Sequence, residues 1–368
     1  MGNINRCGKI DWNNLVYTSD KDDITKYSLQ TNDLLFNRTN SSEWVGKTAI
    51  YKGEKTAIYA GYIVRLRVII LDADYVNFVM NSSYYRGWCN DVKTDAVNQS
   101  NINAQKLSHF FIPIPPLNEQ KRIVNELSSW LNIIEAINKE KSDLQSTICL
   151  AKSKILDLAI HGKLVPQDPN DEPASELLKR INPKAEITCD NPQYGKLPKG
   201  WCETYLGELF NHNTGKALNS SNTEGTMRDY LTTSNVYWNT FDFSVVKKML
   251  FKDNELEKCS VTKGDLLVCE GGDIGRAAIW NLNYDICIQN HIHRLRPKVN
   301  LCVPFYYYTL YYLKVKNMIG GKGIGLLGLS SNALHKIHCP LPPLSEQHRI
   351  VTKIEELFAQ LDKIESSL

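Results

Sequence analysis

The sequence predicts an α+β protein in which one mixed globular domain occurs twice and each copy runs into a long helix. Three observations predict this class. Residues 115–124 (PPLNEQKRIV) and 342–351 (PPLSEQHRIV) are nearly identical, although 227 positions separate them. The segments before both motifs have the residue alternation of strands, and the segments after them repeat apolar residues at the spacing of a coiled coil.

The repeat extends far upstream of the two proline motifs. Residues 33–35 match 265–267, residues 46–50 resemble 275–279, and residues 65–67 match 294–296. The offset between the copies falls from 232 through 229 to 227, so short loop deletions separate them while the order of elements is kept. A period of this length indicates a duplicated domain and not a solenoid of short units.

The repeat divides the chain into five parts. Proline and polar residues dominate residues 163–196, which predicts a linker with one short helix near residues 174–180. The predicted parts are a first globular domain (1–116), a first long helix (117–162), the linker (163–196), a second globular domain (197–343) and a second helix (344–368). Aligned on Asp33 and Asp265, the first domain has no counterpart of residues 197–232, and the second helix is about half as long as the first. We therefore expect a chain that is shortened at both ends.

Within each domain, residues 62–68 and 286–295 carry β-branched and aromatic residues alternating with polar ones, which predicts strands. Residues 303–313 contain five tyrosines and fit either a strand or a helix packed on the sheet.

The double prolines predict the transition from strand to helix. Proline cannot donate to a strand ladder and restricts the residue before it, so a strand ends there and a helix begins at Asn118 or Ser345. From Ile123 to Leu158, apolar residues follow at alternating spacings of four and three, broken only by Lys141. This period of 3.5 predicts a coiled-coil helix, which Gly162 ends as a left-handed cap.

Composition limits the classes of protein. The chain has 368 residues, 42% of them hydrophobic and 23% charged, which suits two globular domains plus helices. It has no bilayer-length apolar run and no apolar N-terminal leader, so we expect a cytoplasmic protein. The ten cysteines form no Cys-x-x-Cys pair and are expected to be reduced thiols in the core. A net charge of +3 requires any phosphate-binding surface to come from the placement of charges.

Three short motifs suggest catalysis or ligand binding without the context that such chemistry needs. Gly46-Lys47-Thr48 lacks the glycine-rich turn and the following helix of a phosphate loop, and residues 323–328 (GIGLLG) lack a βαβ unit around them. His291 and His293 should point to opposite faces of a strand, and His335 and His338 have no ligands at metal spacing. We predict a non-catalytic chain without a metal.

Taken together, the duplicated domains and their proline-to-helix motifs resemble the specificity subunit of type I restriction-modification systems. Four further segments add to the resemblance: residues 2–5 (GNIN), 36–41 (FNRTNS), 98–104 (NQSNINA) and 197–201 (LPKGW). The resemblance covers essentially the whole chain. It implies that each globular domain is a target-recognition domain that reads one half of a split DNA sequence.

The resemblance also implies the roles of the helices and of the partners. The two helices would form an antiparallel coiled coil that spaces the half-sites and docks two methyltransferase subunits, and restriction subunits would join through the complex. S-adenosylmethionine, ATP and magnesium would be used by those partner subunits and not by this chain. The helical stripe would then serve both packing and subunit binding; its members are Ile123, Leu127, Trp130, Ile134, Ile137, Leu144, Ile148, Ile350, Ile354, Leu357 and Leu361.

Candidate DNA contacts follow from the chemistry of bases and phosphates. Arginine and lysine suit guanine edges or phosphates, asparagine and glutamine suit adenine, and tyrosine can stack or bind phosphate. The candidates are Arg38, Asn40, Lys47, Tyr84, Tyr85 and Arg86 in the first domain, and Arg276, Gln289, Asn290 and Lys322 in the second. The repeated arginines Arg65, Arg67, Arg294 and Arg296 suit the scaffold or phosphate contact instead, because two half-sites usually differ.

Two alternatives remain open at this point. The chain could be a coiled-coil interaction protein with two β-rich binding modules and no role on DNA, or a non-functional fragment of a specificity subunit. Salt-dependent binding to duplex DNA in the presence of a methyltransferase subunit separates the first alternative from DNA recognition.

Overall fold

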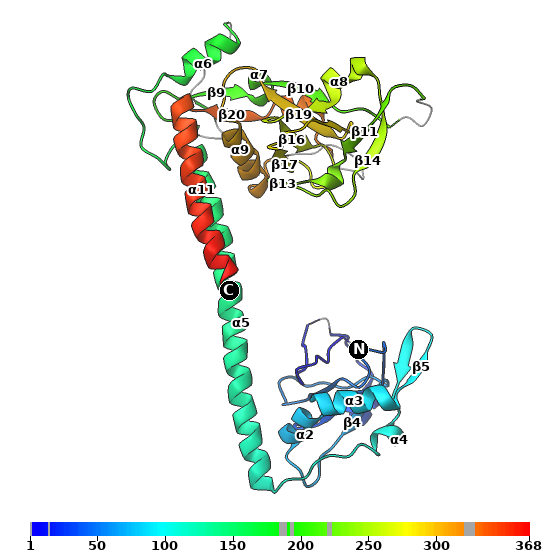
Figure 1. Ribbon diagram of the computed structural model, residues 1–368. Coiled ribbons are helices and arrows are strands. Elements are labelled where there is room, and N and C mark those ends of the chain that lie inside the picture. Colours follow the sequence, from blue (N-terminus) through cyan, green and yellow to red (C-terminus); the bar gives the residue numbers. More distant parts are fainter. Residues whose placement is uncertain (1, 14, 184–189, 192–194, 219–222, 320–327) are drawn as a thin grey trace. The chain divides into compact units, whose positions relative to one another are not determined.

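The computed structural model describes residues 2–13, 15–183, 190–191, 195–218, 223–319 and 328–368 (Figure 1). It divides into two compact units, unit 1 (Met1–Glu140) and unit 2 (Lys141–Leu368). Helix α5 (Leu117–Ile160) begins in unit 1 and ends in unit 2. Each unit mixes helices and sheets, so the predicted α+β class is confirmed.

Unit 1 is built on a small antiparallel sheet in the order β3-β1-β4. A second sheet has the order β2-β6-β5. The strands are β1 (Leu34–Asn37), β2 (Thr39–Asn40), β3 (Thr48–Ile50), β4 (Ile63–Leu66), β5 (Thr94–Ala96) and β6 (Gln99–Asn101). The helices are α1 (Lys21–Tyr27), α2 (Ala73–Val79), α3 (Ser83–Val92) and α4 (Ala104–Leu107), followed by α5. The core lies between the first sheet, α2 and α3, and contains Leu34, Phe36 and Tyr85.

Unit 2 carries two four-stranded sheets, in the orders β10-β19-β16-β17 and β14-β11-β18-β15. The strands of the first are β10 (Phe210–Thr214), β16 (Leu266–Cys269), β17 (Ala277–Ile279) and β19 (Ile292–Pro297). Those of the second are β11 (Thr226–Leu231), β14 (Lys247–Phe251), β15 (Ser260–Val261) and β18 (Ile286–Ile288). The short strands β9 (Cys202–Tyr205) and β20 (His338–Leu341) pair, as do β12 (Val236–Tyr237) with β13 (Thr240–Phe241), and β7 (Asp190–Asn191) with β8 (Gly195–Lys196).

The helices of unit 2 complete its largest core. They are the second half of α5, α6 (Ala174–Ile181), α7 (Leu206–Leu209), α8 (Asp253–Cys259), α9 (Val303–Val315), α10 (Ser331–His335) and α11 (Leu344–Ser366), with a 3-10 turn at Thr233–Asn235. The segment whose sequence fits either a strand or a helix is α9, and most of its side chains are buried, including Tyr306 and Tyr308. Burial on nearly every face removes the period by which a helix is recognised in a sequence.

The two units share one structural plan. Strands β3-β1-β4 of unit 1 correspond to β17-β16-β19 of unit 2, with Leu34 opposite Leu66 in one and Leu266 opposite Leu295 in the other. At the start of unit 1, the Asn3 side-chain amide donates to the Asp11 carbonyl at 3.0 Å. In unit 2, the Asn235 amide donates to the Asp242 carbonyl at 2.8 Å. Residue 3 therefore stands where unit 2 has residue 235.

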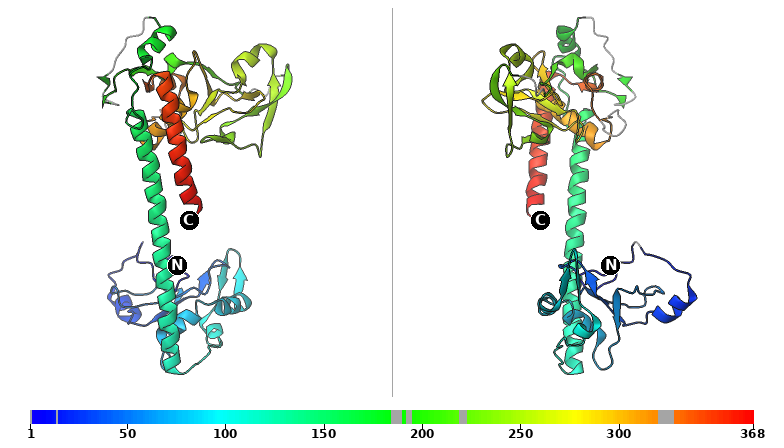
Figure 2. Two further views of the ribbon diagram at one scale, coloured as in Figure 1. Left: turned by 60° about the vertical axis from the view of Figure 1, so that its left-hand side comes forward. Right: turned by 90° about the vertical axis from the view of Figure 1, so that its right-hand side faces the viewer.

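Helix α11 packs antiparallel to the part of α5 that belongs to unit 2 (Figures 1 and 2). The Lys152 ammonium group lies 2.7 Å from a carboxylate oxygen of Asp362 and 2.9 Å from one of Glu365. Lys141 donates to the carbonyl of Leu368, so residue numbers rise along α5 as they fall along α11. The predicted antiparallel pairing of the two helices is confirmed for this region.

Both proline motifs build the same hinge between the globular fold and its helix. In unit 1, the Gln120 side chain accepts from the Asp72 amide at 2.9 Å and donates to the Pro115 carbonyl at 2.8 Å. In unit 2, Gln347 accepts from the Cys302 amide at 3.1 Å and donates to the Pro342 carbonyl at 2.9 Å. Both glutamines are buried, so the hinge ties the first turn of the helix to the start of α2 or α9.

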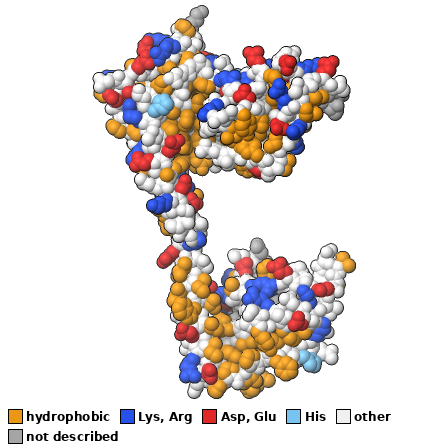
Figure 3. Space-filling model, in the orientation of Figure 1, with side chains coloured by type: hydrophobic (Ala, Val, Ile, Leu, Met, Phe, Trp, Pro, Cys, Tyr) orange, Lys and Arg blue, Asp and Glu red, His pale blue; other side chains and the backbone are white. Residues whose placement is uncertain are grey.

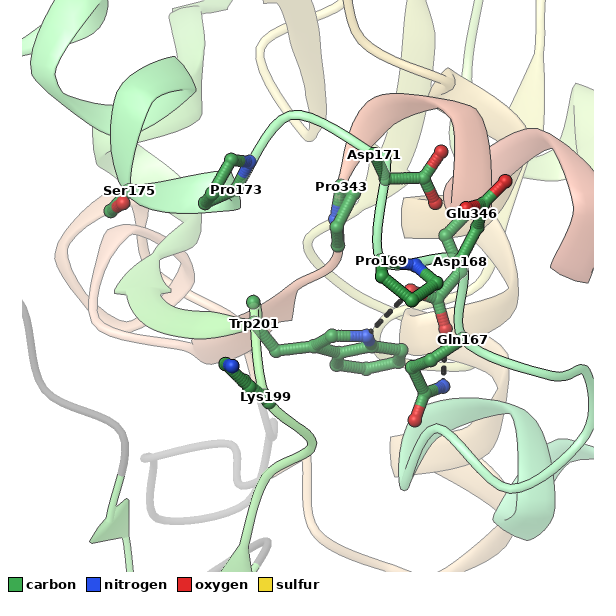
Figure 4. Close-up of a pocket in the computed structure, with 11 residues that line it drawn as sticks. Gln167, Asp168, Pro169, Asp171, Pro173, Ser175, Lys199, Trp201, Pro343 and Glu346 are labelled. Carbon is green, nitrogen blue, oxygen red and sulfur yellow. Dashed lines mark hydrogen bonds between the residues drawn. The ribbon is translucent and has the colours of Figure 1, made fainter.

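The second hinge is covered by residues that follow α5. Glu346 accepts from the Trp201 indole at 2.9 Å and from the Gln167 amide at 2.7 Å, and a pocket of about 550 Å³ lies over these groups (Figure 4). Arg349, one turn further along α11, pairs with Asp171 at 2.6 Å. Burial raises the pKa of the Glu346 carboxyl group, while both hydrogen bonds oppose that rise.

Candidate nucleic-acid interface

The repeated Asp and Arg residues form an ion pair at the same place in each unit. Asp33 and Asp265 directly precede β1 and β16, and each is only 2% exposed. Arg67 reaches Asp33 at 2.8 Å, and Arg296 reaches Asp265 with two nitrogens, at 2.8 and 2.7 Å. These hydrogen bonds raise the pKa of both guanidinium groups.

The other two repeated arginines bind backbone carbonyls within their own unit. Arg65 donates to the Ser28 carbonyl at 3.0 Å, and Arg294 donates to the Glu257 carbonyl at 3.0 Å. The four arginines thus join strands to neighbouring loops. Their geometry agrees with the expectation that shared positions belong to the scaffold.

A second repeated feature is a loop that ends in a glycine followed by a cation. It follows β1 in unit 1 and β16 in unit 2, and ends at Gly46-Lys47 or Gly275-Arg276. Asn37 accepts from the Gly46 amide at 2.9 Å, and Cys269 accepts from the Gly275 amide at 3.1 Å. Both glycines have left-handed backbone, with φ of 85° and 78°, which favours glycine at these positions.

Each of these cations lies over an aromatic ring. The Lys47 nitrogen is 5.0 Å from the centroid of Trp44, and the Arg276 guanidinium is 4.7 Å from that of Tyr237. Arg6 lies over the same Trp44 ring at 4.7 Å. Burial and the nearby Arg6 guanidinium lower the pKa of the Lys47 ammonium group. An aromatic ring attracts a cation that lies over its face and so holds the cation in place.

Five of the six first-domain candidates, including Lys47, are compatible with contact to a ligand. Arg38 is exposed between β1 and β2, and Asn40 is half-buried in β2. Arg86 is exposed on α3 and lines a small depression together with Arg6 and Lys47. In unit 1, basic side chains gather on the surface shown in Figure 3.

The tyrosines of α3 differ from each other. Tyr84 is 55% exposed, although its hydroxyl donates to the Phe111 carbonyl at 3.0 Å. Tyr85 is only 2% exposed, and its hydroxyl donates to the Gly46 carbonyl at 2.8 Å. We therefore remove Tyr85 from the candidates, because a core residue cannot reach DNA. Its role is to support the glycine of the cation-bearing loop.

The second-domain candidates lie on two turns. Arg276 donates to the Thr233 carbonyl beside Tyr237. Gln289 and Asn290 are half-buried in the turn between β18 and β19, where the Asn290 amide donates to the Lys216 carbonyl at 3.0 Å. Lys322 and residues 323–327 lie outside the described residues. The residues missed from the sequence are Arg6, Trp44 and Tyr237, because nothing in a linear pattern places Arg6 beside a loop about forty positions later.

The helical stripe divides into a buried part and an exposed part. Ile148, Ile350 and Ile354 are at most 2% exposed, so we correct their assignment as residues that a partner subunit contacts. Ile350 and Ile354 belong to the largest core of unit 2. Ile123 is half-buried against the core of unit 1, and Leu357 and Leu361 are half-buried on α11. The exposed members are Leu127 (40%), Trp130 (57%), Ile134 (50%), Ile137 (57%) and Leu144 (38%).

Figure 3 shows hydrophobic side chains gathered along the exposed, unit 1 part of α5. Contiguous apolar surface of this kind on a helix marks a protein-binding face. Among the described residues, no three His, Cys, Asp or Glu side chains come together as metal ligands do. No described helix has both the length and the apolar character needed to cross a bilayer.

Comparison with known proteins agrees with this geometry. A family model described as the type I restriction modification DNA specificity domain matches residues 3–146 and 198–367. The chain therefore belongs to the type I restriction-modification DNA specificity family.

The named relatives are specificity subunits of type I restriction enzymes. The MjaX specificity subunit of a type I restriction enzyme from Methanocaldococcus jannaschii is 28% identical over 95% of this chain and 77% of its own length. The EcoBI and EcoAI specificity subunits of Escherichia coli are each 24% identical, over 76% and 86% of this chain. The chain spans 58% of the EcoBI subunit and 66% of the EcoAI subunit.

Solved structures support the fold. One chain comes from a study of complex assembly and conformational transition in a type I restriction-modification system. It aligns with a TM-score of 0.69 and 18% identity, over 99% of this chain and 84% of its own. The HsdS subunit from Thermoanaerobacter tengcongensis aligns with a TM-score of 0.54 and 18% identity, over 99% and 83% of the two chains.

Proposed function

We propose that this chain is the non-catalytic DNA-reading subunit of a type I restriction-modification complex and that each unit reads one half of a bipartite site. Helices α5 and α11 would space the two half-sites and dock two methyltransferase subunits, with restriction subunits joining through the complex. Membership of the specificity family supports the general role. The assignment of residues is our own.

One observation supports this division most directly: each unit places a ring-stacked cation on the same loop of the same sheet. Lys47 and Arg276 are both cations over an aromatic ring at corresponding positions. A positive charge at the same place in both units suits contact with phosphates, which both half-sites have in common. The rest of the two loops differs in sequence: residues 38–46 (RTNSSEWVG) of unit 1 correspond to residues 270–275 (EGGDIG) of unit 2. Different side chains on a common frame suit two different half-sites.

The exposed stripe on α5 supports the docking part of the proposal. Five apolar side chains of the stripe are between 38% and 57% exposed. A helix on the surface of a globular protein normally buries its apolar face against the core. A methyltransferase subunit that brings an apolar helix would cover them.

Salt-dependent binding to duplex DNA, measured with the cognate methyltransferase subunit present, tests the proposal. Lys47→Gln should weaken binding similarly for all sequences and reduce the slope of log K against log salt by about 1. Arg276→Lys keeps the charge but loses the planar fork, so it should keep the slope and lower affinity. Lys21→Gln, an equal loss of charge on exposed α1, is the matched control.

A flat salt response, or no complex with the methyltransferase subunit, contradicts the proposal and favours a protein-interaction role. If Lys47→Gln and Lys21→Gln change the slope equally, the loop has no special part in phosphate binding.

A further inference from the structure

The β5–β6 hairpin of unit 1 projects from the rest of the unit as a two-stranded ribbon (Figure 1). Strand β6 pairs antiparallel with β5 on one side and with β2 on the other. Val97 at the turn is 92% exposed, and all three residues of β5 are exposed. A two-stranded hairpin by itself is at best marginally stable in water, so a projecting ribbon needs other contacts to keep its shape.

Side chains of neighbouring elements fix the root of this ribbon. The Lys106 ammonium group of α4 donates to the Thr94 hydroxyl at 2.7 Å. The Asn101 side-chain amide donates to the Thr39 hydroxyl of β2, also at 2.7 Å. Ile102, which directly follows β6, is completely buried in the core of unit 1. The ribbon is therefore a fixed extension of the core.

The outer end of the ribbon presents two amide side chains. Asn98 and Gln99 are exposed, and within the described part of the chain neither side-chain amide binds another group. Asn98 has left-handed backbone, with φ of 64°, which asparagine tolerates in a turn. Asp95 is the one charged residue among residues 94–101 and accepts from the Ser100 hydroxyl. Because strand side chains alternate, this pair lies on the face of the ribbon opposite Gln99.

Positive charge lies at the root of the ribbon and not at its outer end. Arg38, which directly precedes β2, is exposed, and its carbonyl accepts from the Ile102 amide at 2.9 Å. Lys93, which directly precedes β5, donates to the Ser42 carbonyl at 3.4 Å. Ser42 belongs to the loop that ends at Lys47, so the ribbon stands beside the cation that we assign to phosphate contact.

We propose that the β5–β6 ribbon enters the major groove of DNA and that Gln99 reads an A·T pair there. A two-stranded ribbon fits the major groove. The Gln99 carbonyl would accept from N6 of adenine while its amide nitrogen donates to N7. Arg38 at the root would bind a phosphate at the rim of the groove. The inference rests on the proposed function, because it assigns base reading in unit 1 to one element.

The chemistry of the ribbon favours DNA over a protein partner. Protein interfaces are centred on large apolar and aromatic side chains, whereas Val97 is the one apolar side chain larger than alanine among residues 94–101. DNA presents base edges inside its grooves and phosphates at their rims. Amides at the outer end of the ribbon and cations at its root match that order.

Selection from a pool of random-sequence duplexes, by the complex of the full chain with its methyltransferase subunit, tests the proposal. The native complex should select a bipartite consensus. Gln99→Ala should reduce the preference for adenine at one position of one half-site by about tenfold and leave the other half-site unchanged. Gln105→Ala removes an exposed amide from neighbouring α4 and is the matched control, which should select the native consensus.

A modified base tests the contact itself. 7-Deazaadenine lacks the N7 acceptor, so at the selected position it should weaken binding by the native complex about fivefold and leave binding by Gln99→Ala unchanged. Asn98→Gly keeps a residue that favours left-handed backbone, so it should alter selection at an adjacent base pair without lowering the thermal midpoint. Arg38→Gln should weaken binding to all duplexes similarly and reduce the slope of log K against log salt by about 1.

The outcomes separate the role of the ribbon from DNA recognition as a whole. If the native complex selects no sequence, DNA recognition by this chain fails, and the inference fails with it. If the native complex selects a bipartite consensus and Gln99→Ala selects the same one, only the inference is overturned. Loss of the methyltransferase subunit by Gln99→Ala would also overturn it, because the ribbon would then bind protein.

Discussion

Asp33 and Asp265 show at the level of single residues what the duplication has kept. Each is almost completely buried, and each accepts a hydrogen bond of 2.8 Å from a backbone amide, that of Gln30 or Thr262. Each also binds one arginine: Arg67 directly follows β4, and Arg296 lies in β19. The sequence reveals the repetition of these residues but not their pairing, because the members of each pair are more than thirty positions apart. The structure joins them through the register of antiparallel strands.

Asp265→Asn should destabilise unit 2 by about 1–3 kcal/mol, because the amide cannot hold the Arg296 charge and one buried acceptor becomes a donor. The change is measured as the free energy of unfolding in urea. Asp253→Asn, on the exposed start of α8, should change it by less than about 0.5 kcal/mol. Equal effects of the two substitutions would show that the ion pair contributes nothing beyond surface charge.

His212 gives unit 2 a dependence on pH. Burial, together with the neighbouring His293, His335 and Arg294, lowers its pKa to about 4, and its Nε2 lies 2.9 Å from Nδ1 of His293. A histidine with a lowered pKa stabilises the fold while it is neutral. Its contribution is complete above pH 6.5 and is lost as the pH falls towards 4.

We therefore expect unit 2 of the native chain to lose on the order of 2 kcal/mol of stability across this pH range through His212. His212→Gln should remove that part of the pH dependence, as measured by urea unfolding at several pH values between 4 and 7. The exposed His109→Gln is the control. Identical pH profiles for native chain and His212→Gln would refute the assignment.

The burial of Tyr85 could not be predicted from the sequence. Tyr84, Tyr85 and Arg86 are consecutive, and composition alone cannot say which of them faces inward. Helix α3 turns Tyr85 into the core and leaves Tyr84 and Arg86 on the surface. Residue type therefore identifies chemistry that suits DNA, and only the fold decides which residues are accessible.

At the level of elements, the hinges and the long helix follow most directly from sequence. Double proline stops the strand-like segment, the next residue begins a helix, and the heptad pattern continues to Ile160. The stripe predicts one continuous apolar face, but it does not show where α11 covers that face. Both Ile134 and Ile148 lie in the heptad pattern, and they are 50% and 2% exposed.

These two isoleucines provide a matched pair of substitutions on one helix. Ile148→Asp should destabilise unit 2 by more than about 3 kcal/mol, because it buries a charge in the core. Ile134→Asp should leave the free energy of unfolding nearly unchanged but weaken binding to a methyltransferase subunit at least about tenfold. Normal subunit binding by Ile134→Asp would show that the exposed stripe is not the docking face.

At the level of the whole molecule, the two units share their structural frame and differ in their loop sequences. The strand order, the buried Asp–Arg pair, the hinge glutamine and the loop cation occur in both units. The composition of the cation-bearing loops differs between the units. A common frame with different loops suits a protein that reads two unlike sequences, and this conclusion follows from comparing the units, not from any single residue.

The most direct test of this conclusion is sequencing of genomic methylation in cells with and without the gene. The proposal predicts the loss of one bipartite adenine mark on deletion. Exchanging the unit 1 loop 38–46 for that of another family member should alter one half of the mark and leave the other half unchanged. An unchanged methylation pattern after deletion would contradict DNA recognition by this chain.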